Sequence, residues 1–363
     1  MRIILFSILV LAVLSCRDKE RSDEVVEETA ISKGDTIVND YAQAFRIIEH
    51  AAFVQIDIID PDIDSVLYQY GIGEHVPDEF IALKSNIKQI AALSSTHVGM
   101  IRELGLESHI KGVSNTKYLC DTAGTEGWVD FGELGKADPE LYVSNDPDLI
   151  MYSGFKLDIP ILKKLKKLGV NSMVNYDWKE THPLGRAEWL KVFGLLFNEE
   201  NKAREKFEKI KVEYLRIAEF IKNSPVSPTV FVGTIYGDIF NVPGGDSYMA
   251  KMLKDANVNY VYSSTEGTGS LNLSLEKVII TNRSTDYWIN VAANSKQEIL
   301  NMNGNFEMLG AFKKDQVYSY FFDVNCFWEG SAVAPQKVLS DLIHIFHPDQ
   351  FEQSELHYYR QII

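Results

Sequence analysis

Hydrophobic residues along the chain first occur in short runs that are rich in β-branched and aromatic side chains. Such runs predict strands at 45–48, 53–59 and 66–70. Further along, apolar runs alternate with segments of helical periodicity. The expected strands are 90–93, 110–113, 149–152 and 172–176, and the expected helices are 97–104 and 159–168. This alternation is typical of a mostly parallel sheet with helices on its faces.

A longer helical pattern begins near Gly185. Residues 185–197 predict one helix and residues 198–223 predict a second, in which apolar residues recur every three or four positions. The recurring positions are Ala203, Phe207, Ile210, Tyr214, Ile217 and Phe220. At 1.5 Å per residue the second helix would span about 39 Å, which is enough to cross a small domain.

Alternation of strands and helices then resumes. The expected strands are 229–233, 258–262, 285–290 and 316–320, and the expected helices are 248–253, 273–281 and 335–346. The plan is therefore an N-terminal α/β lobe at 41–184, connecting helices at 185–225 and a C-terminal α/β lobe at 226–363. Loops at the carboxyl ends of parallel strands bind ligands in such folds, so we expect the two lobes to face each other across a ligand cleft.

The start of the chain has the layout of an export signal. One positive charge at Arg2 precedes an apolar run from Ile3 to Leu14, which is too short to span a bilayer as a helix. Cys16 follows directly after Ser15, and this arrangement resembles a bacterial lipobox. We therefore expect a lipoprotein signal peptide at 1–15, then a lipidated Cys16 and a flexible tether at 16–40. The alternative is an ordinary signal peptide with a cysteine near its cleavage point.

Composition narrows the function. The net charge is −15 and the one basic run lies at 163–167, which argues against a nucleic-acid partner. Besides Cys16 the chain has two cysteines, Cys120 and Cys326, and their spacing leaves open whether they pair. The sequence contains no GxSxG or HExxH pattern and no cluster of His and Cys with metal spacing. These absences argue against the two alternatives to a binding protein for a metal chelate, which are an exported α/β enzyme and a Zn or Mn receptor of related fold.

Four segments in order resemble one family. They are ALSSTHVGMIRELGLESHIKGVSN at 92–115, PDLIMYSG at 147–154, VPGGDSYMAKMLKDANVNYVY at 242–262 and LSDLIHIFHPDQF at 339–351. Together they resemble the periplasmic binding proteins of ABC importers for iron–siderophore complexes, haem and cobalamin. The resemblance implies two Rossmann-like lobes joined by a single long interdomain helix, the class III periplasmic binding protein fold. Residues 242–247 lack the spacing and lysine of a phosphate loop, and we interpret them as a tight turn into a capped helix at the cleft.

The resemblance also implies a function. The protein would be a lipid-anchored, monomeric binding component, in the periplasm or at the cell surface, without intrinsic cofactor or enzymatic activity. It would capture a ferric siderophore, haem or a corrinoid and deliver it to a permease dimer. The chain has few arginines suited to a strongly anionic catecholate complex, which favours a neutral or aromatic ligand, whereas the breadth of the family favours iron complexes.

Aromatic residues in the loops are the candidate ligand-binding groups, because rings bury much area with little loss of entropy. They are Tyr118, Trp128, Tyr152, Phe155 and Trp178 in the first lobe and Tyr236, Tyr248 and Trp328 in the second. The alternative for each ring is that it lies in the core or at the rim of the cleft. Lys117 and Arg283 are candidates for pairing with ligand carboxylates.

Two glutamates, one per lobe, are candidates for docking to the permease. Glu140 and Glu276 match the places of the family's docking residues, although ordinary solvated acids are the alternative. For iron in a bound haem, His97 and Tyr118 are weak candidate axial ligands. The residues predict no resident metal site.

Overall fold

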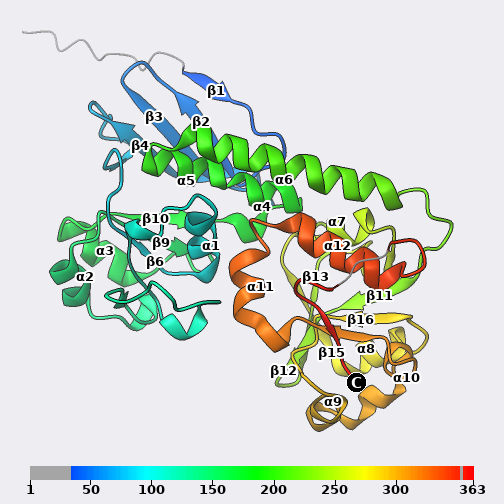
Figure 1. Ribbon diagram of the computed structural model, residues 1–363. Coiled ribbons are helices and arrows are strands. Elements are labelled where there is room, and N and C mark those ends of the chain that lie inside the picture. Colours follow the sequence, from blue (N-terminus) through cyan, green and yellow to red (C-terminus); the bar gives the residue numbers. More distant parts are fainter. Residues whose placement is uncertain (1–33, 352–354) are drawn as a thin grey trace, which may run out of the picture. The chain divides into compact units, whose positions relative to one another are not determined.

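The computed structural model describes residues 34–351 and 355–363 (Figure 1). The expected signal peptide, Cys16 and most of the tether lie outside these residues. Within the described residues, no helix combines the length and the apolar composition that crossing a membrane requires.

A five-stranded sheet comes first in the chain. Its strands are β1 (Asp35–Ile37), β2 (Phe45–Glu49), β3 (Phe53–Asp60), β4 (Ser65–Gly73) and β5 (Ile81–Leu83). They lie in the order β1-β2-β3-β4-β5, and every pair is antiparallel except β4 with β5. The strands predicted at 45–48, 53–59 and 66–70 are confirmed. One face buries apolar side chains such as Phe45, whose ring meets that of Trp189 edge-on at 4.9 Å.

The second sheet is parallel throughout, as predicted. It contains β6 (Ile90–Ala92), β7 (Ile110–Val113), β8 (Val129–Asp130), β9 (Leu149–Ser153) and β10 (Ser172–Asn175). Its order β10-β9-β6-β7-β8 places the buried runs β6 and β9 inside the sheet. Its helices are α1 (Ser95–Glu103), α2 (Pro139–Asn145) and α3 (Pro160–Lys167), of which α2 was not predicted.

Three helices connect this sheet to the rest of the chain. The run predicted at 185–197 is two helices, α4 (Pro183–Glu188) and α5 (Leu190–Phe197), and Asn198 ends α5 in the left-handed conformation. The long helix α6 (Glu200–Ile221) is confirmed and links the lobes (Figure 1). Lys206 of α6 pairs with Glu103 of α1, and further along α6 the hydroxyl of Tyr214 donates to Asp255.

The predicted apolar stripe of α6 is correct except at one position. Phe220 is exposed on the helix, where its ring meets that of Phe351 edge-on at 5.6 Å. The buried residue of this last turn is Ile221 instead. The helical period brings both positions close to the stripe, so the pattern alone did not separate them.

The C-terminal lobe contains two sheets. The main sheet has the order β14-β11-β16-β17-β18, with β11 (Thr229–Val232), β14 (Asn259–Tyr260), β16 (Tyr287–Ile289) and β17 (Val317–Ser319) parallel and β18 (Arg360–Gln361) antiparallel. The smaller, antiparallel sheet contains β12 (Thr234–Tyr236), β13 (Ile239–Pro243) and β15 (Ser270–Ser274). The helices are α7 (Tyr248–Asp255), α8 (Leu275–Thr281), α9 (Lys296–Met302), α10 (Gly310–Lys313), α11 (Val324–Gly330) and α12 (Pro335–Phe346).

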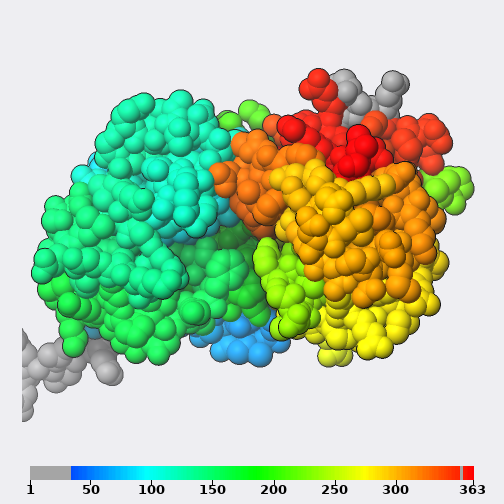
Figure 2. All heavy atoms as spheres, turned by 90° about the horizontal axis from the view of Figure 1, so that it is seen from below, coloured from blue at the N-terminus to red at the C-terminus, as the bar shows by residue number. Residues whose placement is uncertain are grey.

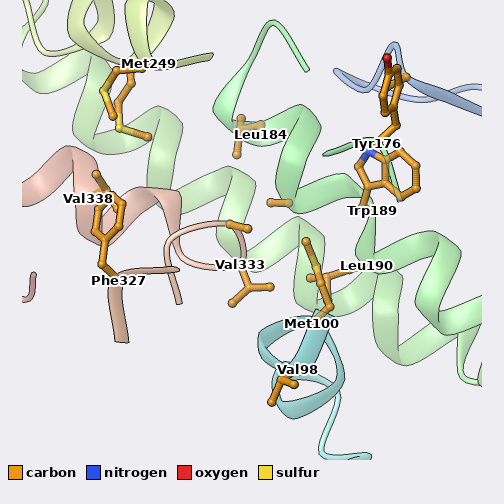
Figure 3. Close-up of a cluster of buried hydrophobic side chains, with 14 of the residues drawn as sticks. Val98, Met100, Tyr176, Leu184, Trp189, Leu190, Met249, Phe327, Val333 and Val338 are labelled. Carbon is orange, nitrogen blue, oxygen red and sulfur yellow. The ribbon is translucent and has the colours of Figure 1, made fainter. Parts of the chain in front are cut away.

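One helix boundary in this lobe was wrongly predicted. The helix expected from Leu273 begins at Leu275, because residues 270–274 pair along β13. Buried apolar residues form one continuous core through both lobes. Figure 3 shows how Val98 and Met100 of α1, Leu190 of the connecting helices and Phe327 of α11 belong to the same cluster.

Helix α11 follows the last parallel strand of the C-terminal lobe but packs against α1 of the first lobe. A disulfide joins Cys326 to Cys120, which settles the pairing that the sequence left open. The carboxylate of Glu329 pairs with Arg102 and accepts from the backbone N–H of Cys120 at 3.0 Å. At Gly99 a Cβ atom would lie 1.9 Å from the carbonyl oxygen of Glu329, so only glycine allows this approach.

The turn between β3 and β4 also contacts both lobes. Asp62 forms an ion pair with Lys179 of the first lobe, and its Oδ1 accepts from the hydroxyl of Thr268 in the second lobe at 2.8 Å. The neighbouring Asp60 accepts from the hydroxyl of Tyr176 at 3.3 Å. The lobes are therefore joined at α6, at the contact of α11 with α1, and at this turn.

Candidate functional site

A cleft of about 680 Å³ lies between the two lobes, where Figure 2 shows a hollow in the surface. Its walls come from the carboxyl ends of the parallel strands. Ser153 is the last residue of β9, Asn290 follows β16 and Tyr320 follows β17. The expected arrangement of facing strand ends is thus observed.

Aromatic rings stand on both walls of the cleft. Of the eight rings that the sequence singled out, five line it: Phe155, Trp178, Tyr236, Tyr248 and Trp328. Phe155 stacks on Trp178 with 5.0 Å between ring centroids. The side chains of Phe155 and Tyr236 are 72% and 66% exposed, so large apolar surfaces from opposite lobes are open to a ligand.

The other three predicted rings lie outside the lining of the cleft. Tyr152 is buried within β9, where burial raises the pKa of its hydroxyl above the ordinary value. Trp128 lies beneath the guanidinium of Arg102 at 5.9 Å. Tyr118 is exposed beside the amine of Lys117, which lies 4.8 Å from its ring centroid. Arg283 is exposed and also lies outside the lining.

His97, the weak candidate for haem ligation, is fully buried on α1 and does not line the cleft. Its ring lies 6.2 Å from that of Phe193. Burial lowers the pKa of the imidazole to about 4, and the charge of Asp177 offsets part of this effect. Among the described residues, no group of three or more His, Cys, Asp and Glu side chains could hold a metal ion.

The sequence reasoning missed a buried ion pair in the wall of the cleft. Asp177 lies on the 3₁₀ turn η4 (Asp177–Lys179), and Arg186 lies on α4. The Nε and Nη2 atoms of Arg186 donate to Oδ2 of Asp177 at 3.1 and 2.9 Å. The guanidinium also lies 4.4 Å from the ring centroid of Tyr248. An arginine directly after the apolar start of this helix, Pro183-Leu184-Gly185, was the available signal.

Arg186 keeps its charge although it is buried. Burial disfavours the guanidinium, but the nearby groups Tyr248 and Asp177 outweigh this effect and raise the pKa of Arg186. Uncharged polar groups complete the lining. They are Ser94, Ser95, Thr96, Ser153, Thr234, Ser247, Thr268, Ser270, Asn241 and Asn290.

The turn before α7 is confirmed as a tight turn into a capped helix at the cleft. The hydroxyl of Ser247 donates to the carbonyl of Gly244 at 2.6 Å and accepts from the N–H of Ala250 at 3.2 Å. Pro243, Ser247 and Tyr248 all line the cleft. The cap therefore fixes the position from which Tyr248 reaches Arg186.

The two candidate docking glutamates have matching local structures. Glu140 lies in the first turn of α2, which Asp138 caps by accepting from the N–H of Glu140 at 3.0 Å. Glu276 lies in the first turn of α8, which Ser274 caps by accepting from the N–H of Lys277 at 3.4 Å. Both glutamates are exposed, and each lies on a different lobe.

Comparison with known proteins gives one family and several relatives. The sequence profile of a family described as periplasmic binding protein matches residues 90–323, from β6 to the end of η6 (Phe321–Asp323). The N-terminal sheet β1–β5 precedes the matched region. An uncharacterized lipoprotein of Methanocaldococcus jannaschii is 26% identical over 302 residues, which cover 79% of this chain and 71% of that protein.

Two solved structures share the fold. A periplasmic haem-binding protein from Pseudomonas aeruginosa has a TM-score of 0.61 at 16% identity, with 76% of this chain and 98% of that chain covered. A periplasmic binding protein from Veillonella parvula has a TM-score of 0.60 at 18% identity, with 82% of this chain and 99% of that chain covered.

Proposed function

Because this chain belongs to the periplasmic binding protein family, we propose that it is the substrate-binding component of an ABC importer for an iron chelate, haem or a corrinoid. Members of this family bind a cargo rather than catalyse a reaction on it. The observation that carries the proposal is the cleft, which aromatic rings from both lobes line. Its volume of about 680 Å³ falls within the range of roughly 300–1,000 Å³ that is usual for ligand sites.

The ligand class rests on the lining and on the neighbours. Stacked and facing rings such as Phe155, Trp178 and Tyr236 suit a large ligand with flat or apolar faces. A structural neighbour that is a haem-binding protein supports this class of ligand. The proposal of a corrinoid is supported only by the aromatic rings that line the cleft.

Binding can be tested with one defined panel of ligands. Purified protein would be titrated with cyanocobalamin, haemin and ferric siderophores while absorption and tryptophan fluorescence are recorded. We expect at least one of them to bind and Trp178→Ala to weaken that binding about tenfold or more. Trp128→Ala is the matched control, because this ring lies outside the cleft. Failure of the whole panel to bind would contradict the proposed function.

We further propose that Cys16 carries a lipid that holds the protein at a membrane surface. The order of apolar run, Ser15 and Cys16 supports this, as does a relative that is named a lipoprotein. Cys16→Ser should move the protein from the membrane fraction to the soluble fraction and leave ligand affinity unchanged. A protein that stays with the membrane, or one that loses its ligand, would show that Cys16 has a different role.

Docking to a permease is assigned to Glu140 and Glu276. Two exposed carboxylates, one on each lobe, suit recognition of cations on a two-subunit partner. Glu140→Lys and Glu276→Lys should reduce uptake and leave ligand affinity unchanged. Glu205→Lys, which reverses an exposed charge on α6, is the matched control. Full uptake by the double variant would refute this assignment.

A further inference from the structure

The charges at the cleft cancel. Of the lining residues that the structure describes, Asp177 and Arg186 are the only ones with a formal charge. They are 3% and 5% exposed, and two hydrogen bonds join them. The remaining polar side-chain groups of the lining are hydroxyls, amides and the indole N–H groups of Trp178 and Trp328. The cleft is thus polar and aromatic but has no net formal charge.

An anionic ligand would find no unpaired cation here. Nε and Nη2 of Arg186 are bonded to Asp177, and an anion that met the remaining Nη1 would also meet the negative charge of Asp177, so the pair offers it little net attraction. Tyr248 covers the guanidinium as well, which further limits the approach of a second anion.

An uncharged ligand meets none of these obstacles. Asn241 and Asn290 offer amide groups that both donate and accept, and hydroxyls such as that of Ser95 do the same. The rings supply contact area to apolar faces of the ligand. The lining therefore matches a chelate whose outer surface consists of amides, hydroxyls and apolar groups.

On these grounds we infer that the cargo carries no net negative charge and that the Asp177–Arg186 pair excludes anionic chelates from the cleft. This inference rests on the proposed function, since it names the class of chelate that the same cleft would hold. Asp177 and Arg186 are then specificity-determining residues, because they select against a class of ligand.

The test compares ligands of similar build and different charge. Cyanocobalamin, which is neutral, is paired with haemin, which carries two propionates. Ferrichrome, a neutral ferric trihydroxamate, is paired with the trianionic ferric enterobactin. Quenching of tryptophan fluorescence reports binding, since Trp178 and Trp328 line the cleft. In the pair that binds, we expect the neutral member to have an affinity at least tenfold higher.

Asp177→Asn changes the charge of the cleft with little change of shape. It leaves Arg186 uncompensated, so we expect the preference for the neutral member to fall about tenfold or to reverse. Asp148→Asn is the matched control, because Asp148 is ion-paired to Lys84 and lies outside the cleft. An unchanged preference in a folded Asp177→Asn protein would overturn the inference.

A measurement on the unaltered protein covers the case in which Asp177→Asn does not fold. The affinity of the bound probe should be insensitive to NaCl between 50 and 500 mM, because salt screens charge pairing and has little effect on neutral contacts. Tighter binding of the anionic members, or affinity that falls steeply with salt, would overturn the inference and leave the proposed function intact. Failure of all four probes to bind would defeat the proposed function and the inference with it.

Discussion

Two of the contacts between the lobes differ in kind. At one, an ion pair and close backbone packing hold α11 against α1, and a disulfide joins α11 to Cys120 of the first lobe. At the other, the turn between β3 and β4 reaches the second lobe through Thr268, whose hydroxyl donates to the carboxylate of Asp62. We therefore expect the cleft to be held firmly at the contact of α11 with the first lobe and to open more easily at the turn between β3 and β4.

Exposure to water explains the difference. The side chain of Glu329 is 8% exposed, so a broken pair with Arg102 would leave a charge away from solvent. The side chain of Asp62 is 32% exposed, and water can replace its partners at low cost. Both contacts touch the cleft, because Trp328 precedes Glu329 and because Thr268 lines it. Ligand entry is therefore expected at the side of the turn.

Removing the disulfide tests the firm side with the largest expected effect. The two cysteines are 206 residues apart, so the bond restricts a large loop of the unfolded chain. Cys120→Ser with Cys326→Ser should lower the free energy of unfolding by about 2–5 kcal/mol, as measured by urea denaturation. The unaltered protein in reducing agent should behave like the double variant. Equal stability with and without the disulfide would contradict the view that α11 is firmly held.

Acid should weaken the same side through His97 of α1. Burial lowers the pKa of this imidazole to about 4, whereas its ordinary value is 6.5. As the pH falls, the unfolded chain therefore binds a proton at His97 before the folded chain does, which favours unfolding. The stability that this neutral imidazole contributes is complete above pH 6.5 and is lost as the pH falls toward 4. The loss approaches about 3 kcal/mol. The slope of unfolding free energy against pH should be shallower in His97→Gln.

The slope is the informative quantity, because His97→Gln also changes packing at every pH. His75→Gln is the control, since His75 is exposed. If His97→Gln and the unaltered protein showed parallel curves between pH 4 and 6.5, the buried imidazole would not be the acid-sensitive group.

Gly99→Ala tests the packing of α1 against α11. The new Cβ would meet the backbone oxygen of Glu329, which cannot move aside as a flexible side chain can. We expect a loss of about 1–3 kcal/mol in urea denaturation. Gly135→Ala is the matched control, because a Cβ at that position has no neighbour within 4 Å. Similar stability of the two variants would show that α11 yields easily.

The sequence predicted the parts of the fold that depend on local pattern. A strand or helix can be recognised from its own residues when the pattern is strong. Examples are the buried apolar runs of β6 and β9 and the periodic apolar stripe of α6. Strand β15 was missed because its pairing partner β13 lies about thirty residues earlier, and the segment Leu273–Ser274 fits a helix start equally well. In this segment, pairing with a distant strand outweighed the local preference for a helix.

The same holds for the candidate site, where only residues with a local sequence signal could be predicted. Loop aromatics such as Trp178 and Trp328 could be selected because they stand outside periodic runs, whereas Tyr152 belongs to a strand that is buried on both faces. The pair of Asp177 with Arg186 depends on how η4 and α4 meet, and no spacing rule encodes that. The contact of α11 with α1 pairs Glu329 with Arg102, more than 200 positions earlier, so it too required the structure.

Asp62→Ala has the smallest expected effect on stability and addresses the weaker side directly. It removes the acceptor for Thr268 and the ion pair with Lys179, which together contribute less than about 1 kcal/mol at a partly exposed site. Amide hydrogen exchange should nevertheless become several-fold faster around Thr268, while exchange in α1 and α11 stays unchanged. Ile63→Ala, at an exposed position of the same turn, is the control. If exchange in α11 rose as much as at Thr268, the two contacts would open together, and the distinction between a firm and a yielding side of the cleft would fail.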